Sequence, residues 1–311
     1  MEKIIIKLTK LYYTFKFKKY LKKIRELIEK NHKKNITVLD IGAAGGANSK
    51  WKIFGNKIDI ILVEPHKESA LELKNNGIKV IESVLSSKDN EEIKFYNAKK
   101  PLNSSFYKPN FNHLNKFSDS ERFKIISEES VVTKKLDTEI KKFNQPYFIK
   151  IDTEGSELDI LKGSTETLSN VFGLEVECSF YQLRENQPLF DDIRKYLENL
   201  DFEFVDFASM IRWEKDKFSF FGQPQITDAL FLKKEELIIE KFKSDKLQME
   251  DLMNYFAILI AYERIDILKF VYKTAGVSSK YIEEIINVLE IKQEKINKLK
   301  EANYLIEHQT L

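Results

Sequence analysis

The chain has 311 residues, and although 32% of them are charged, its formal net charge is only +2. This length corresponds to roughly two structural units of about 150 residues, and the low net charge argues against a polyanion-binding surface over the whole molecule. A single cysteine, Cys178, excludes an internal disulfide framework and fits a reducing cytosol. No apolar run approaches the roughly 18 residues of a membrane-spanning helix. We therefore expect a cytoplasmic protein.

Positive charge is concentrated at the N-terminus. Residues 1–34 contain twelve Lys and Arg against three Glu, a balance of +9 that leaves −7 for the rest of the chain. Apolar side chains recur there at helical spacing, which predicts a basic amphipathic helix; they are Tyr13, Phe17, Tyr20, Ile24 and Leu27. Two interpretations stay open. The helix makes peripheral contact with an anionic membrane at its inner face, or it packs on the domain that follows and exposes its lysines to water.

A glycine-rich turn follows the first apolar run, residues 36–39, and this run predicts a buried strand over 36–41. A dinucleotide fingerprint needs glycine at the first, third and sixth positions of the turn, where this chain has Gly42, Ala44 and Ala47. Asp40 before the turn would repel a pyrophosphate but can pair with an ammonium group. The pattern favours S-adenosylmethionine (SAM), which has an ammonium and a sulfonium but no phosphate.

The next segments continue a nucleotide-binding pattern. Residues 58–63 predict a second strand that ends at Glu64-Pro65, where an acid can accept hydrogen bonds from ribose hydroxyls. A helix over 67–75 and a strand over 78–81 lead to Ser83 and Val84, at the sheet edge where an adenine can be held. The alternative is an ordinary strand–helix–strand unit in which Asp40 caps and Glu64 is solvated.

A long polar stretch separates this region from the second group of acids. A strand over 91–96 precedes residues 97–128, for which we expect an irregular lid or binding loop in which Ser104 and Ser105 form part of the acceptor-side wall. A short strand over 130–134 and a short helix over 136–142 follow.

The second group of acids follows a strand over 147–151. Asp152 and Glu154 lie at its carboxyl end, where side chains face the ligand crevice, in a turn that Gly155 permits. Ser156 can cap the helix over 157–162. Glu177 lies near the end of the next strand, over 173–178. The alternative for Asp152 and Glu154 is that they only favour the helix N-terminus through its dipole.

The remaining chain divides at about residue 234. A helix over 188–199 and strands over 202–207 and 229–232 close the sheet, with a turn at 222–224. Residues 235–311 have helical periodicity and predict a separate cap or oligomerisation unit. We thus expect three parts: a helix over 1–34, an α/β domain over 35–234 and a helical domain over 235–311.

Five ordered stretches of the α/β domain resemble the FkbM family of SAM-dependent methyltransferases. They are Val38 to Gly46 with Trp51; Val63-Glu64-Pro65; Ile149 to Glu157 with Leu161-Lys162-Gly163; Glu175-Val176-Glu177 through Gln187 to Phe190; and Asp228 to Leu232. The resemblance implies a Rossmann-like class I methyltransferase sheet of seven strands, the last antiparallel. It also implies that Asp40, Gly42, Ala43 and Gly46 line the methionine end of SAM and Glu64 its ribose. Ala44 departs from the family, in which many members have a polar residue.

The resemblance further implies methyl transfer to a hydroxyl oxygen, often on a sugar of a surface glycan or on a natural product. Asp152 or Glu154 would take the hydroxyl proton, with Glu177 as a further base or sugar-binding acid. His66 and His113 are alternative bases, and the acids could instead bind a divalent cation, although no metal site is predicted.

Two other classes of function stay open: a scaffold that interacts through its helical end, and a nucleic-acid methyltransferase. The net acidic catalytic region opposes phosphate binding, so no nucleic-acid partner is expected. A homo-oligomer through the C-terminal helices is also considered.

Overall fold

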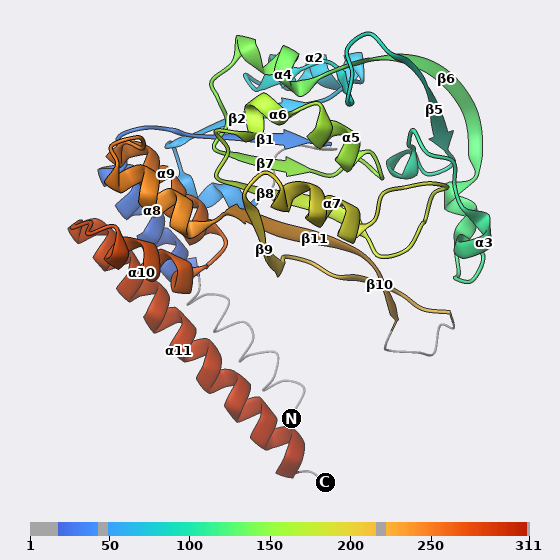
Figure 1. Cartoon of the computed structure of the whole chain (residues 1–311). Helices are drawn as coiled ribbons and strands as arrows, with labels where there is room; N and C mark the ends of the chain where they lie inside the picture. The colour runs from blue at the N-terminus through green and yellow to red at the C-terminus, as the bar shows by residue number, and fades with distance from the viewer. Residues whose placement is uncertain (1–17, 43–48, 216–221, 310–311) are drawn as a thin grey trace. The chain divides into compact units, whose positions relative to one another are not determined.

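The computed structural model describes residues 18–42, 49–215 and 222–309 (Figure 1). The chain forms two compact units. One, the sheet unit, comprises residues 36–48 and 59–234; the other, the helical unit, comprises residues 1–35, 49–58 and 235–311. The N-terminal helix and the C-terminal helices, which the sequence presents as separate segments, thus belong to one compact unit.

The sheet unit is built on a mostly parallel sheet with, among the described residues, eight strands: seven in the order β10-β11-β8-β7-β1-β2-β3, and β9, which also pairs with β11. The strands are β1 (Ile36–Ile41), β2 (Ile58–Val63), β3 (Lys79–Ile81), β7 (Phe148–Ile151), β8 (Gly173–Ser179), β9 (Phe202–Phe207), β10 (Ile211–Trp213) and β11 (Gln223–Lys233). Every residue of β1 and of β7 is buried, as their continuous apolar sequences predict for strands covered on both faces.

The predicted sheet of seven strands with the last antiparallel is confirmed. β1, β7 and β8 pair in parallel, and β11 runs antiparallel to both β8 and β9. The short β10 is an additional strand at the start of β11. The turn predicted at residues 222–224 is wrong, because Gln223 and Pro224 already belong to β11. Pro224 is tolerated there because the β10–β11 pairing has a register shift beside it, between Ile211 and Arg212.

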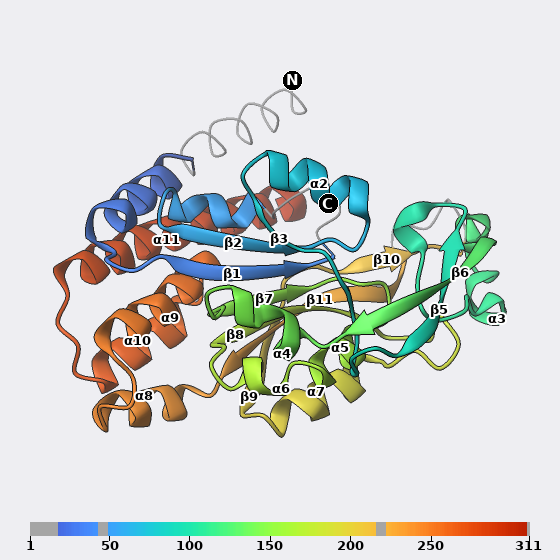
Figure 2. The same ribbon diagram turned by 90° about the horizontal axis from the view of Figure 1, so that it is seen from above.

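Helices cover both faces of the main sheet, as Figure 2 shows, with α2 on one side and α4 to α7 on the other. These helices are α2 (Lys67–Asn75), α4 (Leu136–Glu139), α5 (Glu157–Lys162), α6 (Thr165–Leu168) and α7 (Phe190–Glu198). α2 ends as predicted at Asn76 and Gly77, and Gly77 has a φ of +79°. The apolar residues of β1, β7 and β8 and of α5 and α7 form one continuous core.

A second, three-stranded sheet lies beside the ends of the main strands (Figure 1). It consists of β4 (Val84–Leu85), β5 (Glu92–Ala98) and β6 (Ile125–Lys134), with β6 antiparallel to β5. The expectation of an irregular stretch over 97–128 is therefore wrong at both of its ends. Most of β6 is exposed, so no alternation of apolar and polar residues marks it, and only pairing with β5 makes it a strand. Between β5 and β6 lie three short helical segments: η2 (Pro101–Asn103), α3 (Phe111–Leu114) and η3 (Ser120–Phe123).

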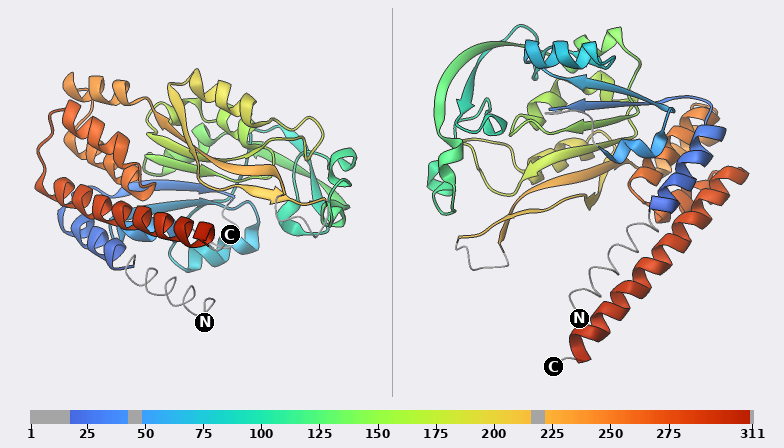
Figure 3. Two further views of the ribbon diagram at one scale, coloured as in Figure 1. Left: turned by 90° about the horizontal axis from the view of Figure 1, so that it is seen from below. Right: turned by 180° about the vertical axis from the view of Figure 1, so that it is seen from behind.

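The helical unit contains a helix over residues 18–31, η1 (Ser49–Phe54), α8 (Glu235–Lys243), α9 (Met249–Ala261), α10 (Ile265–Thr274) and α11 (Lys280–Gln309). On the N-terminal helix, Ile24 and Ile28 are buried and Lys22 is exposed, while Tyr13 and Phe17 lie outside the described residues. His32 Nε2 is 2.6 Å from Asn254 Oδ1 on α9. In Figure 3, the C-terminal part of α11 extends past the other described helices of this unit.

No helix in the described part of the chain is long and apolar enough to cross a membrane. Peripheral membrane contact through residues 1–34 and a homo-oligomer through the C-terminal helices stay predictions.

Candidate active site

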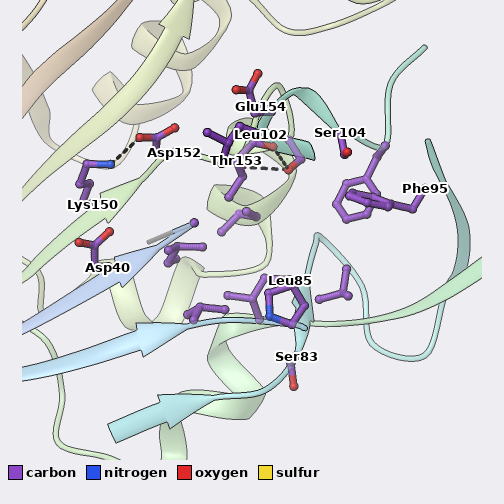
Figure 4. A pocket seen from close by; sticks show the side chains of 18 of the residues that line it. Asp40, Ser83, Leu85, Phe95, Leu102, Ser104, Lys150, Asp152, Thr153 and Glu154 are labelled. Atoms are coloured by element: carbon purple, nitrogen blue, oxygen red, sulfur yellow. Dashed lines mark hydrogen bonds and ion pairs between the residues drawn. The ribbon is translucent and has the colours of Figure 1, made fainter. Parts of the chain in front are cut away.

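A cavity of about 500 Å³ opens in the sheet unit where the carboxyl ends of the main strands face the second sheet (Figure 4). Three groups of side chains line it. From the ends of β1 and β2, and from β4 with the residue before it, come Asp40, Ile41, Gly42, Val63, Pro65, Ser83, Val84 and Leu85; from β7 and α5 come Lys150, Asp152, Thr153, Glu154, Ser156 and Ile160; from β5 and the segment after it come Phe95, Pro101, Leu102, Ser104 and Phe106.

The turn after β1 and the turn after β7 meet at Gly42. This residue has a φ of +85°, and a β-carbon on it would lie 1.8 Å from the main-chain oxygen of Asp152. Glycine is therefore required both by the backbone conformation and by the close approach of the second turn. Asp40, two residues earlier, is 1% exposed and lines the cavity. Ala43 and Gly46, predicted to complete this end of the site, lie outside the described residues.

Three of the predicted cofactor residues line the cavity: Pro65 after β2, Ser83 between β3 and β4, and Val84 in β4. Glu64 lies between two lining residues, Val63 and Pro65, but is not itself among the lining residues. Its carboxylate accepts a 2.8 Å hydrogen bond from the main-chain N–H of His66. Its own N–H donates to the carbonyl of Ile81 on β3.

The turn after β7 is held by a buried acid rather than by the serine that the sequence suggested as a cap. The carboxylate of Glu157 accepts hydrogen bonds from the N–H groups of Thr153 and Gly155, each 3.0 Å long. Ser156 makes no side-chain capping bond, and its hydroxyl donates instead to Thr153 Oγ1 at 3.0 Å. Ser156 stands at the N-cap position, but its φ of −97° and ψ of 11° are not the extended backbone that a capping serine usually has.

The three predicted catalytic acids have different surroundings. Asp152 lines the cavity and accepts a 2.7 Å hydrogen bond from Lys150 Nζ. Glu154 also lines the cavity, but it is ion-paired with the guanidinium of Arg184; burial nevertheless raises the pKa of Glu154. Glu177 on β8 is not a lining residue. Burial, and next the charges of neighbouring acids, first of all Asp152, raise the pKa of Glu177 well above its ordinary value.

Two cations that were not predicted from the sequence pair with two of these acids, Lys150 with Asp152 and Arg184 with Glu154. Lys150 is 9% exposed and Arg184 is 1% exposed. Arg184 also donates to the main-chain oxygen of Asn103 at 3.2 Å, so it joins the turn after β7 to the segment before Ser104. The charged Lys150 within an apolar strand was a signal that could have been used. No local pattern marked Arg184, which is 30 residues away from its partner Glu154.

Neither alternative base lies in the cavity. His113 has its Nε2 2.7 Å from Gln225 Oε1, and its ring stacks on Tyr181. His66 precedes α2 and is exposed. Among the described residues, no group of three or more His, Cys, Asp or Glu is arranged to hold a metal ion.

The residues present fit SAM. The buried Asp40 at the end of β1 suits an ammonium group, the glycine at position 42 lets two main-chain turns approach each other, and Val63, Val84, Leu85 and Ile160 supply apolar lining. The strand order, with an antiparallel β11 between β8 and β9, together with a ligand crevice at the carboxyl ends of the strands, defines the fold of a class I SAM-dependent methyltransferase.

The comparison with protein families agrees. Residues 40–204 match the family model described as "Methyltransferase FkbM domain", which is more than half of the chain. The chain therefore belongs to the FkbM methyltransferase family. It is a SAM-dependent methyltransferase, and S-adenosylmethionine is its cofactor.

Solved structures resemble the chain at low identity. Magnesium protoporphyrin IX methyltransferase from Synechocystis with bound SAM is 9% identical, with 70% of this chain and 79% of that chain covered, at a TM-score of 0.34. Precorrin-6y C5,15-methyltransferase from Geobacter metallireducens is 11% identical (68% and 86% covered, TM-score 0.34). TrmK from M. capricolum with bound S-adenosylhomocysteine is 9% identical (86% and 97% covered, TM-score 0.31). No curated protein matches the chain, so the acceptor has to be argued from the site.

Proposed function

We propose that this methyltransferase transfers the methyl group to a hydroxyl oxygen of a saccharide, in a surface glycan or a related sugar acceptor. The observation that carries the proposal is the grouping of carboxylates beside the cofactor cavity, at the ends of β7 and β8. A hydroxyl is a poor nucleophile until its proton is removed, and a carboxylate within hydrogen-bonding reach can take that proton.

Asp152 suits the role of base best. Its side chain is 35% exposed and lines the cavity, so an acceptor can reach it, and the Lys150 ammonium holds one of its oxygens. Glu154 is less suitable, because its side chain is only 25% exposed and pairs with the buried Arg184. We assign Glu154 to positioning the turn; Glu177 does not line the cavity, and its part as a further base or sugar-binding acid stays a prediction.

The chemistry is a direct displacement, for which SAM supplies an activated methyl group. With SAM bound, Asp152 would take the proton of the acceptor hydroxyl as its oxygen attacks the methyl carbon, and the sulfur of SAM would leave with the electron pair of the carbon–sulfur bond. The protein's part is to hold the acceptor in line and to accept the proton, and such positioning supplies much of the acceleration in reactions of this type.

The composition of the cavity supports a sugar rather than a nucleic acid as the acceptor. Its acidic side chains, Asp40, Asp152 and Glu154, repel phosphate, and the carboxylate of Asp152 is a hydrogen-bond acceptor that suits a hydroxyl group. The opposite wall contains Phe95 and Phe106, whose rings lie 5.4 Å apart, and supplies an apolar surface for one face of a ring. If the glycan is carried on a lipid, residues 1–34 are suited to peripheral contact with the inner membrane face.

The full chain, purified, is to be incubated with methyl-labelled SAM and a panel of nucleotide sugars, methyl glycosides and short oligosaccharides, and any labelled product located by NMR. We expect label on a sugar oxygen with wild type and almost none with Asp152→Asn. Label on a nitrogen or carbon, or on RNA or DNA in place of every sugar, would contradict the proposal. An Asp152→Asn variant as active as wild type would remove Asp152 as the base.

A further inference from the structure

A buried lysine lies between the two halves of the active site. Lys150 is on β7, with Asp40 of β1 and Glu175 of β8 as its neighbours in the sheet. Figure 4 shows its side chain between those of Asp40 and Asp152. Its ammonium group is 2.7 Å from Asp152 Oδ2. Among the described residues that line the cavity, Lys150 is the only cation.

Burial makes a lysine energetically unfavourable at this position. The preceding and following residues of β7, Ile149 and Ile151, are 0% and 1% exposed, and burying an ammonium group without partners costs several kcal/mol. Carboxylates compensate the charge: those of Asp152, Asp40 and Asp228 together raise the pKa of Lys150 against the effect of burial, so the side chain stays protonated.

Methyl transfer moves a positive charge within this cavity, from the sulfur of the cofactor to a carboxylate. The carbon–sulfur bond breaks, its electron pair stays on sulfur, and the cationic sulfonium becomes a neutral thioether while the acceptor's proton moves to a carboxylate. A fixed cation lining the same cavity interacts less unfavourably with the neutral product than with the cationic cofactor.

We propose that Lys150 is a positioning residue with two effects. It fixes the carboxylate of Asp152, and its charge offsets the negative potential of the cavity. The second effect lowers the preference of the site for the cationic cofactor SAM over the neutral product S-adenosylhomocysteine. The effect on the cofactor follows from the chain's being a SAM-dependent methyltransferase. The effect on Asp152 rests on the proposed function.

The test compares two ligands that differ in charge. Calorimetry of the full chain gives Kd for SAM and for S-adenosylhomocysteine in wild type, Lys150→Met and Lys150→Arg. Loss of the cation should shift the ratio of the two Kd values about tenfold in favour of SAM, because one repulsive charge is gone from a partly buried site. Lys150→Arg keeps the charge and should stay within about twofold of wild type. Sinefungin, which has an amine where SAM has its methyl sulfonium, should follow SAM.

The controls separate charge from packing. Lys162→Met removes an exposed lysine at the end of α5 and should change neither Kd. If Lys150→Met does not fold, as judged by its thermal unfolding, Lys150→Gln replaces it. An unchanged ratio, or an equal loss of affinity for both ligands, would overturn the proposal and leave Lys150 a structural residue. No acceptor is used, so the result is independent of whether the acceptor is a sugar.

Discussion

The two turns that meet in the cavity hold their acidic side chains in different ways. The turn after β1 presents Asp40 from the rigid end of a buried strand, and its neighbour Gly42 makes room for the other turn. The turn after β7 presents Asp152 and Glu154, and each of these is held by a cation, Lys150 and Arg184. The first turn is therefore suited to binding a cofactor of constant structure, and the second to holding acids in place for a reaction.

This difference implies a division of effects. Substitutions in the turn after β1 should weaken SAM binding and leave the chemical step nearly intact. Substitutions in the turn after β7 should lower kcat or stability and leave SAM binding nearly intact. The four predictions below test this division, from the largest expected effect to the smallest.

Arg184→Met should have the largest effect, on stability. The guanidinium is 1% exposed and pairs with the buried side of Glu154, and removal of one partner of a buried pair costs about 3–5 kcal/mol. Urea unfolding measures the loss. The matched control is Arg194→Met: Arg194 pairs with Asp191 and Glu198 on the exposed face of α7, where such pairs contribute at most about 1 kcal/mol. Equal losses in the two variants would show that the Arg184 pair is not special.

Asp152→Asn should lower kcat by about 10²–10⁴, the usual contribution of a general base, while Kd for SAM changes by less than about threefold. Steady-state kinetics with the acceptor from the panel and calorimetry with SAM measure the two quantities. Asp191→Asn, on the surface of α7, serves as the control and should leave both unchanged. A large loss of SAM affinity in Asp152→Asn would break the division between the two turns.

Asp40→Asn should raise Kd for SAM by about 10–100-fold, the value of a charge-assisted hydrogen bond, and leave kcat at saturating SAM within a few-fold of wild type. Asp59→Asn, on β2 and paired with Lys79, is the control. If Asp40→Asn binds SAM normally but loses kcat, then Asp40 takes part in the reaction, and the turn after β1 does not serve SAM binding alone.

The smallest effect concerns pH. Because burial and neighbouring acids raise the pKa of Glu177 above its ordinary value of 4.5, the folded protein binds a proton there that the unfolded chain has already lost. Stability should therefore decrease as the pH rises above about 4.5, until the folded-state pKa of Glu177 is passed. In Glu177→Gln this decrease should be smaller, and the difference should amount to a few degrees in Tm between pH 5 and pH 8.

Glu185→Gln, which replaces an exposed acid, should retain the pH dependence of the wild type. If Glu177→Gln has the same dependence as wild type, then the fall of stability with pH belongs to other buried acids of the turn, such as Glu157, whose pKa burial also raises.

Much of the fold could be predicted from the sequence because the central strands of the main sheet, β1, β7 and β8, are buried almost throughout. Their apolar runs, with the glycine turn and the acids that follow them, predict strands ending at a ligand crevice, and β1, β2 and β9 have the predicted bounds. Gly42 could likewise be singled out locally, since a tight turn requires glycine whatever surrounds it.

The second sheet could not be predicted in this way. β6 has most of its residues exposed, and strands of this kind are defined by their partner rather than by their own pattern. The residues between β5 and β6, which the sequence marked as a loop, contribute Pro101, Leu102, Ser104 and Phe106 to the cavity, but their place opposite the main strands follows only from the pairing of β5 with β6.

The sequence by itself therefore determined the class of the protein, its main sheet and the acids at the strand ends, because backbone geometry and burial on both faces leave local marks. Only the tertiary structure decided which cation holds which acid, that Glu157 rather than Ser156 stabilises the turn, and that Glu177 has a raised pKa. These properties depend on distances between segments far apart in the chain, and on burial, which no local pattern specifies.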